Sequence, residues 1–283
     1  MPDPSDDHEF QYNPQRAFPD FAEYGARRQP WNDAALAGLT KIADLAYGDH
    51  PLRRLDLFPG KPLDGRPCPV HVFIHGGYWR AQDKLDYAYV AAPLAARGVT
   101  TAVINYELCP ASTLDGVADS AIAAVEWLHR NVAQHGGDRM AISLSGHSAG
   151  AHLCAEALAV DWAARGIDPG FITGAVMLSG IFDPAPAMGT TVNDMLRLTP
   201  EIIARRDVER RPVGITGPAW LFAGGREPWR WIDQTFRYAH HLHRSGGDPA
   251  VQVLPGYNHF DIIDQYHDAE SPIAQAVLRS AGR

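Results

Sequence analysis

The segment GHSAG holds Ser148 between Gly146 and Gly150. An apolar run typical of a buried strand (140–146) precedes it, and a helical pattern (148–166) follows. This strand–turn–helix context favours a nucleophile elbow, a turn so sharp that a Cβ at either glycine would clash with neighbouring elements. Because the elbow lifts its serine hydroxyl above the sheet, we predict that Ser148 is a nucleophile for acyl transfer.

A serine needs a general base, and that base needs a carboxylate to orient it. His259, in GYNHFDII, lies in a loop directly after the last expected strand. Glu227 is the first carboxylate after the preceding strand (219–225), and we favour it as the acid. Asp183, which follows an earlier strand, is the alternative, while Asp233 falls further on, inside the next expected helix.

The string HGGYW follows another apolar strand (70–74). Attack on a carbonyl creates an oxyanion, which must be met by preorganised N–H donors. One donor is expected from Ala149, directly after the nucleophile, and others from the loop after an earlier strand. Gly76 and Gly77 would let that loop lie against the substrate, so the N–H groups of Gly77 and Tyr78 are predicted to point inward. His75 and Trp79 are expected to support the loop, His75 through side-chain hydrogen bonds and Trp79 by packing beneath it.

From residue 70 onward, short apolar runs alternate with helical patterns, which predicts a doubly wound, mostly parallel α/β sheet with helices on both faces. An alternating stretch at 52–58 suits a half-exposed strand. No linker divides the chain, so residues 1–283 are expected to form one domain. Residues 1–9 are expected to be a disordered lead. The long irregular insertion at 181–217 is a candidate lid, since ligands of open α/β sheets sit at the carboxyl ends of the strands.

The composition narrows the function classes. The chain has 283 residues, a net charge of −8 and no basic stripe, which disfavours nucleic acids and anionic membranes as partners. No apolar run is long enough to span a membrane, and the acidic, Pro-rich N-terminus is unlike a signal peptide. Three cysteines without paired spacing indicate reduced thiols and a cytoplasmic protein. The expected partner is a small-molecule ester or amide, and a homodimer stays open.

Three weaker features favour structural roles. His240 and His243 share a helix face but have no third ligand nearby, so we expect a solvated helix end and no metal. Cys109 and Cys154 are expected to be small core residues. The segment RRDVERR at 205–211 is expected to be a solvated lid face, with an arginine that binds a substrate carboxylate as the alternative.

Five strings together carry a resemblance to a known family: HGGYW, NYELCP, GHSAGAHL, TTVNDMLRLTPE and GYNHFDII. They resemble the arylformamidase-like α/β-hydrolases, the serine enzymes typified by kynurenine formamidase. The N-terminal EFQYNPQRAFPDF is also similar to that family, so the resemblance covers nearly the whole chain. It implies an α/β-hydrolase fold, no cofactor, and hydrolysis of a formyl anilide such as N-formylkynurenine. The family's acid is an aspartate seven residues before a glutamine; here Glu227 stands seven before Gln234, so the position matches and the residue differs.

Alternative functions are a short-acyl carboxylesterase, a carbamate or lactone hydrolase, and, from a different class, a non-catalytic small-molecule receptor on the same fold. Tyr78, Asn193 and Phe260 are candidates for lining the substrate pocket.

Overall fold

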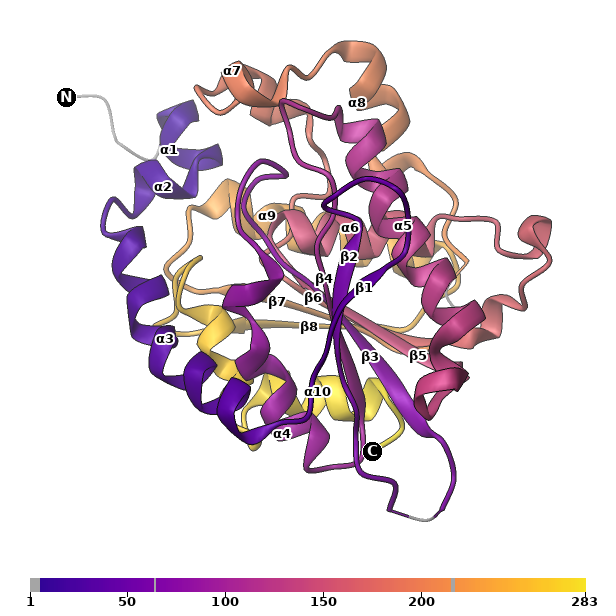
Figure 1. Ribbon diagram of the computed structural model, residues 1–283. Coiled ribbons are helices and arrows are strands. Elements are labelled where there is room, and N and C mark those ends of the chain that lie inside the picture. Colours follow the sequence, from indigo (N-terminus) through magenta and orange to yellow (C-terminus); the bar gives the residue numbers. More distant parts are fainter. Residues whose placement is uncertain (1–5, 64, 215–216) are drawn as a thin grey trace.

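A mostly parallel sheet runs through the centre of the protein (Figure 1). The computed structural model describes residues 6–63, 65–214 and 217–283. Within these residues the sheet has eight strands in the order β1-β2-β4-β3-β5-β6-β7-β8. The pairs β1–β2 and β2–β4 are antiparallel, and every later pair is parallel. The strands are β1 (Ile42–Ala46), β2 (Arg54–Phe58), β3 (Cys68–Ile74), β4 (Thr100–Ile104), β5 (Gly137–His147), β6 (Ile172–Leu178), β7 (Ala219–Gly224) and β8 (Pro249–Leu254).

Helices cover both faces of this sheet, so the predicted doubly wound arrangement is confirmed. Helices α5, α6 and α9 lie on one face of the sheet, and α3, α4 and α10 lie on the other (Figure 1). Buried side chains of the first three helices belong to one hydrophobic core, and those of the other three to a second core. Central strands serve both cores: in β3, Val72 belongs to the first and Phe73 to the second. The helices are α1 (His8–Tyr12), α2 (Pro14–Ala17), α3 (Phe21–Gly38), α4 (Ala91–Ala95), α5 (Leu114–Asn131), α6 (Ala149–Leu158), α7 (Asn193–Leu196), α8 (Pro200–Arg206), α9 (Trp229–Arg244) and α10 (Pro272–Ser280).

Local capping explains where several helices begin. The side chains of Thr113, Thr199 and Ser271 accept hydrogen bonds from backbone N–H groups in the first turns of α5, α8 and α10. Pro200 and Pro272 follow two of these caps, at a position where a missing N–H costs nothing and the fixed φ suits a helix.

The N-terminal part of the chain differs most from expectation. Strand β1 was not predicted, and β2 is buried rather than half-exposed, because β1 and β4 flank it. Of the expected disordered lead, residues 1–5 lie outside the described residues, but His8 and Glu9 begin α1. The ring of His8 is hydrogen-bonded to the backbone oxygen of Pro186, and the Glu9 carboxylate accepts from Thr191. Tertiary contacts therefore order this end of the lead.

The described part of the insertion between β6 and β7 is folded rather than irregular. It contains a 3₁₀ turn (Ala185–Gly189), α7, α8 and a second 3₁₀ turn (Val208–Arg210). Apolar side chains along it, including Phe182, Ile203 and Val208, are buried in the core shared with α5, α6 and α9. This packing makes the insertion part of the body of the domain.

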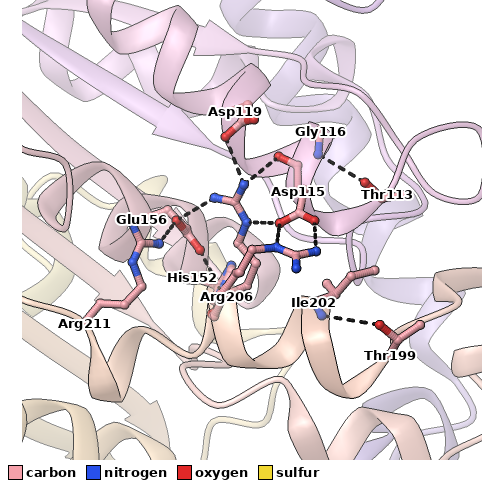
Figure 2. Close-up of polar contacts among 11 residues, drawn as sticks. Thr113, Asp115, Gly116, Asp119, His152, Glu156, Thr199, Ile202, Arg206 and Arg211 are labelled. Atoms are coloured by element: carbon pink, nitrogen blue, oxygen red, sulfur yellow. Dashed lines mark hydrogen bonds and ion pairs between the residues drawn. The ribbon is translucent and has the colours of Figure 1, made fainter. Parts of the chain in front are cut away.

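Ion pairs fasten the same insertion to α5 and α6 (Figure 2). The guanidinium of Arg206 donates to Asp115 at 2.6 Å, to Asp119 at 3.0 Å and to the fully buried Glu156 at 3.2 Å. Arg211 also binds Glu156. The expected solvated face is present only in part: Arg205 and Arg210 are exposed, whereas Arg206 and Arg211 are not. Neither Arg206 nor Arg211 is available for a substrate carboxylate, because the carboxylates of α5 and α6 bind them.

Candidate active site

The turn between β5 and α6 has the geometry of a nucleophile elbow. Ser148 adopts φ 55° and ψ −117°, a conformation that costs energy in a non-glycine residue. A Cβ on Gly146 would lie 2.3 Å from the backbone of Gly150, and one on Gly150 would lie 2.0 Å from the carbonyl oxygen of Ile74. Only glycine fits at both positions, so the steric reason given for the GHSAG motif holds in the structure.

Three side chains from distant parts of the sequence meet at this turn. The Ser148 Oγ lies 3.0 Å from the Nε2 of His259. On the other side of the ring, the Nδ1 of His259 lies 3.4 Å from the Oε1 of Glu227. All three residues are buried. The structure thus brings together the serine, the histidine and the favoured carboxylate.

The two alternative carboxylates lie elsewhere. Asp183 and Asp233 both face Arg237, at 3.7 and 3.3 Å. The side chain of Gln234 accepts hydrogen bonds from the backbone N–H groups of Phe182 and Asp183. Gln234 therefore fixes the chain just after β6, and it is Glu227, at the end of β7, that reaches the histidine.

The environment of Glu227 controls its charge. Burial raises the pKa of Glu227, and a hydrogen bond from the Ser179 hydroxyl, at 2.5 Å, partly offsets this. Burial also lowers the pKa of His259. Desolvation thus disfavours both charged forms, whereas their proximity favours an ion pair once the ring gains a proton.

A second histidine holds the loop that carries His259. The Nε2 of His147 lies 2.8 Å from the backbone oxygen of His259, and because a carbonyl only accepts, this nitrogen carries the proton. The indole of Trp231 packs edge-on against the His259 ring, with centroids 4.8 Å apart. The side chain of Asn258 accepts from the backbone N–H of Phe260 at 2.8 Å. These contacts fix the ring beside Ser148.

The HGGYW loop borders the same space. Tyr78 and Trp79 have positive φ values of 52° and 56°, and Gly77 has φ 104°. A Cβ on Gly77 would lie 2.2 Å from the carbonyl oxygen of Ala81. The sequence-based reason for this glycine, close approach to a substrate, is therefore corrected: the loop's own fold requires it. Gly76 is different, because its Cβ would lie 3.0 Å from the His147 ring and 3.3 Å from the Cβ of Ser148.

The predicted supports of this loop are in place. The Nδ1 of His75 lies 2.8 Å from the backbone oxygen of Gly76, and its ring stacks on Tyr106 with centroids 4.4 Å apart. Trp79 is fully buried and meets His152, one turn into α6 from the nucleophile, at a centroid distance of 5.1 Å. Ala149, the first residue of α6, is fully buried behind Ser148.

A pocket of about 210 Å³ opens beside Ser148 and His259. Gly76, Gly77, Tyr78 and Phe260 also line it, and much of the rest of its wall comes from α2, α3 and the loop after HGGYW. Two expectations are corrected here. Among the described residues of the 181–217 insertion, none lines this pocket, because the insertion packs against α5, α6 and α9, so the covering elements are N-terminal. Asn193 lies outside the pocket as well, since its Oδ1 accepts from the backbone N–H of Leu198 at 2.9 Å.

The chain is similar to several known proteins. The family model BD-FAE matches residues 55–165. A kynurenine formamidase of Danio rerio is 26% identical over 98% of this chain and 97% of its own length. A probable isoprenylcysteine alpha-carbonyl methylesterase of Arabidopsis thaliana is 26% identical over 78% of this chain and 51% of its own length. A putative thioesterase from Silicibacter sp. TM1040, known from its crystal structure, superposes with a TM-score of 0.79 at 24% identity, covering 94% of this chain and 97% of that one. The chain is a hydrolase with the α/β-hydrolase fold, and it is similar to the kynurenine formamidases.

Sequence reasoning about this hydrolase missed two polar residues of the site. Ser179 directly follows β6 and so lies at the carboxyl edge of the sheet, where the ligands of open α/β sheets bind. His147 stands inside GHSAG itself, beside the nucleophile. Its ring lines the pocket, and because Nε2 carries the proton, Nδ1 is an acceptor. The positions of both residues were visible in the sequence, but their contacts were not.

The remaining candidate groups of this hydrolase are not among the described residues that line the pocket. All three cysteines are buried, and none of them is joined in a disulfide. His240 and His243 lie on the exposed side of α9, and within the described ranges no three His, Cys, Asp or Glu side chains gather as metal ligands would. In the same part of the chain, no helix combines the length and apolar character needed to cross a bilayer.

The contact at Gly77 gives a prediction about loop stability. We expect Gly77→Ala to lower the free energy of unfolding by more than about 1 kcal/mol, and the melting temperature with it. The new Cβ would meet a backbone carbonyl at a residue whose φ is positive. Gly246→Ala is the matched control, with φ 91° but open space around its Cβ. Thermal unfolding of both variants measures the difference. If Gly77→Ala were no less stable than Gly246→Ala, the loop would have room for a side chain and this explanation would fail.

Proposed function

We propose that this protein is a serine hydrolase that cleaves a small amide or ester by acyl transfer, with a formyl anilide such as N-formylkynurenine as the leading substrate. The observation that carries the proposal is the hydrogen-bonded contact of Ser148 with His259, backed by Glu227, at the wall of a small pocket. The near full-length similarity to a kynurenine formamidase supports the choice of substrate.

In the proposed mechanism, the Ser148 Oγ attacks the carbonyl carbon while the Nε2 of His259 takes its proton. Glu227 carries its charge at this point and stabilises the imidazolium that forms. The ring then gives the proton to the departing amine or alcohol. A water molecule, deprotonated by the same histidine, hydrolyses the acyl-enzyme and releases the acid.

The proposed oxyanion donors are the backbone N–H groups of Ala149, Gly77 and Tyr78. Ala149 begins α6, and the first N–H groups of a helix have no partner within it. Gly77 and Tyr78 line the pocket on the side of the HGGYW loop. Donors fixed in the backbone need no rearrangement when charge develops on the substrate oxygen.

A substrate panel tests the proposal. The values of kcat/KM for N-formylkynurenine, short-chain esters, a lactone and a carbamate would be compared on the same preparation. We expect N-formylkynurenine to give the highest value. Higher values for short esters would favour the second candidate, a carboxylesterase, which the similarity to a methylesterase supports. No turnover of any of them, including 4-nitrophenyl acetate, would indicate a non-catalytic receptor.

Ser179 gives a prediction specific to this site. Because its hydroxyl donates to Glu227, it stabilises the charged carboxylate that the mechanism needs. Removing it in Ser179→Ala raises the pKa of Glu227 further, so the acid limb of the pH profile of kcat/KM should move to higher pH. We expect kcat at neutral pH to fall roughly tenfold, the loss of one charge-assisted hydrogen bond. An unmoved pH profile would show that Ser179 acts only through packing.

A cytoplasmic location also belongs to this proposal. It is supported by the three buried cysteines, since thiols that are not joined in disulfides suit a reducing compartment.

A further inference from the structure

Arg80, the residue after HGGYW, carries a positive charge that no described carboxylate balances. Its Nη2 donates to the side chain of Gln15 at 3.1 Å. Its Nε is buried and has no hydrogen-bond partner. A guanidinium has five N–H donors in a planar fork, so most of the donor capacity of Arg80 is unused. The residue as a whole is half-buried, but a buried N–H without a partner is costly unless something binds it.

The position of this cation is within the pocket of the proposed nucleophile. Arg80, Ser148 and His259 all line it. The backbone N–H of Arg80 donates to the carbonyl oxygen of Gly77 at 3.1 Å, so its main chain is fixed to the HGGYW loop. Gln15, its side-chain partner, belongs to α2 and is exposed. The guanidinium therefore reaches across the opening between this loop and the N-terminal helices.

The charges around the pocket have one sign. Arg28 and Arg80 line it, and no Asp or Glu is among the described residues that do, although the whole chain has a net charge of −8. Arg28 is already neutralised, because its Nε donates to Asp264 at 2.6 Å and its Nη2 to the backbone oxygen of Phe260. Arg80 is thus the lining cation with its charge unmatched, and it makes the pocket attractive to an anion.

We propose that Arg80 is a specificity-determining residue that binds a carboxylate of the substrate, at a distance from the bond being cleaved. This inference rests on the proposed function, since it takes the pocket beside Ser148 to be the substrate site. The planar fork suits a carboxylate, which can accept two parallel N–H bonds. The preferred substrates are therefore anionic esters or amides, and their uncharged analogues bind less well.

Matched substrates test this proposal. One pair varies the leaving group, 3-carboxyphenyl acetate against 3-carbamoylphenyl acetate; the other varies the acyl group, 4-nitrophenyl hydrogen adipate against its methyl ester. We expect the wild type to prefer the carboxylate in at least one pair. In Arg80→Met that preference, the ratio of kcat/KM values, should fall about 10- to 100-fold, mainly through KM. Arg80→Lys should restore part of it, because the charge returns without the fork.

Arg97→Met is the control for removing a positive charge. Arg97 is exposed, pairs with Glu270 and precedes β4, at the end of the sheet opposite the site. Its loss should leave the preference unchanged. Equal preferences in the wild type and Arg80→Met, or an equal fall in Arg97→Met, would overturn the assignment.

A binding measurement separates this inference from the proposed function. Calorimetry on Ser148→Ala with benzoate and with benzamide needs no turnover. We expect benzoate to bind more tightly, and its affinity to fall about tenfold or more in Ser148→Ala/Arg80→Met. If the wild type hydrolyses none of the esters but benzoate binding still depends on Arg80, the proposed function fails and the anion site stands. Benzoate affinity that does not depend on Arg80 would overturn the anion site alone.

Discussion

Ser148→Ala is expected to lower kcat by roughly 10⁶-fold, the largest effect of any single substitution in this protein. The hydroxyl at 3.0 Å from His259 is the attacking group in the proposed mechanism, and alanine leaves nothing to form the acyl-enzyme. Folding should be little affected, because the strained backbone at this position is held by the elbow and accepts alanine as readily as serine. Steady-state turnover of the best substrate, with a melting curve on the same sample, measures both.

Ser245→Ala is a control, because this serine is exposed at the end of α9. It should leave turnover unchanged. A fluorophosphonate probe gives a second readout, since it should label Ser148 in the wild type and nothing in Ser148→Ala. Labelling at another serine, or retention of most activity in Ser148→Ala, would show that the nucleophile lies elsewhere.

Glu227→Gln is expected to lower kcat by about 10⁴-fold, with the protein still folded. Glutamine keeps the shape of the side chain but cannot stabilise the imidazolium that forms when His259 takes the serine proton. Its amide N–H₂ can also turn toward Nδ1 and favour the wrong tautomer of the ring. The measurement is kcat for the variant and the wild type at the same pH.

Asp183→Asn and Asp233→Asn are the matched controls. Both carboxylates face Arg237 of α9 rather than His259. Each should cost far less activity than Glu227→Gln. A greater loss in Asp183→Asn would place the acid one strand earlier in the chain and would contradict the geometry of this site.

The parts of this protein that the sequence determined are those fixed by local sterics and chain order. Gly146 and Gly150 could be assigned to an elbow because a turn of that sharpness excludes Cβ atoms, whatever the rest of the fold does. Short apolar runs alternating with helical patterns were enough for a doubly wound sheet, since strands covered on both faces must be apolar throughout. His259 and Glu227 followed from these two facts, because the carboxyl ends of parallel strands share one edge.

What only the tertiary structure decided depends on contacts between segments far apart in the chain. The pocket is covered by the N-terminal helices and not by the described residues of the 181–217 insertion, because buried side chains and the ion pairs of Arg206 hold those residues against α5 and α6. Ser179 meets Glu227 across 48 residues of sequence, and the reason for glycine at position 77 is the carbonyl of Ala81. No local sequence pattern predicts these contacts. Residue types and spacing indicate which groups can react, but packing decides which neighbours surround them.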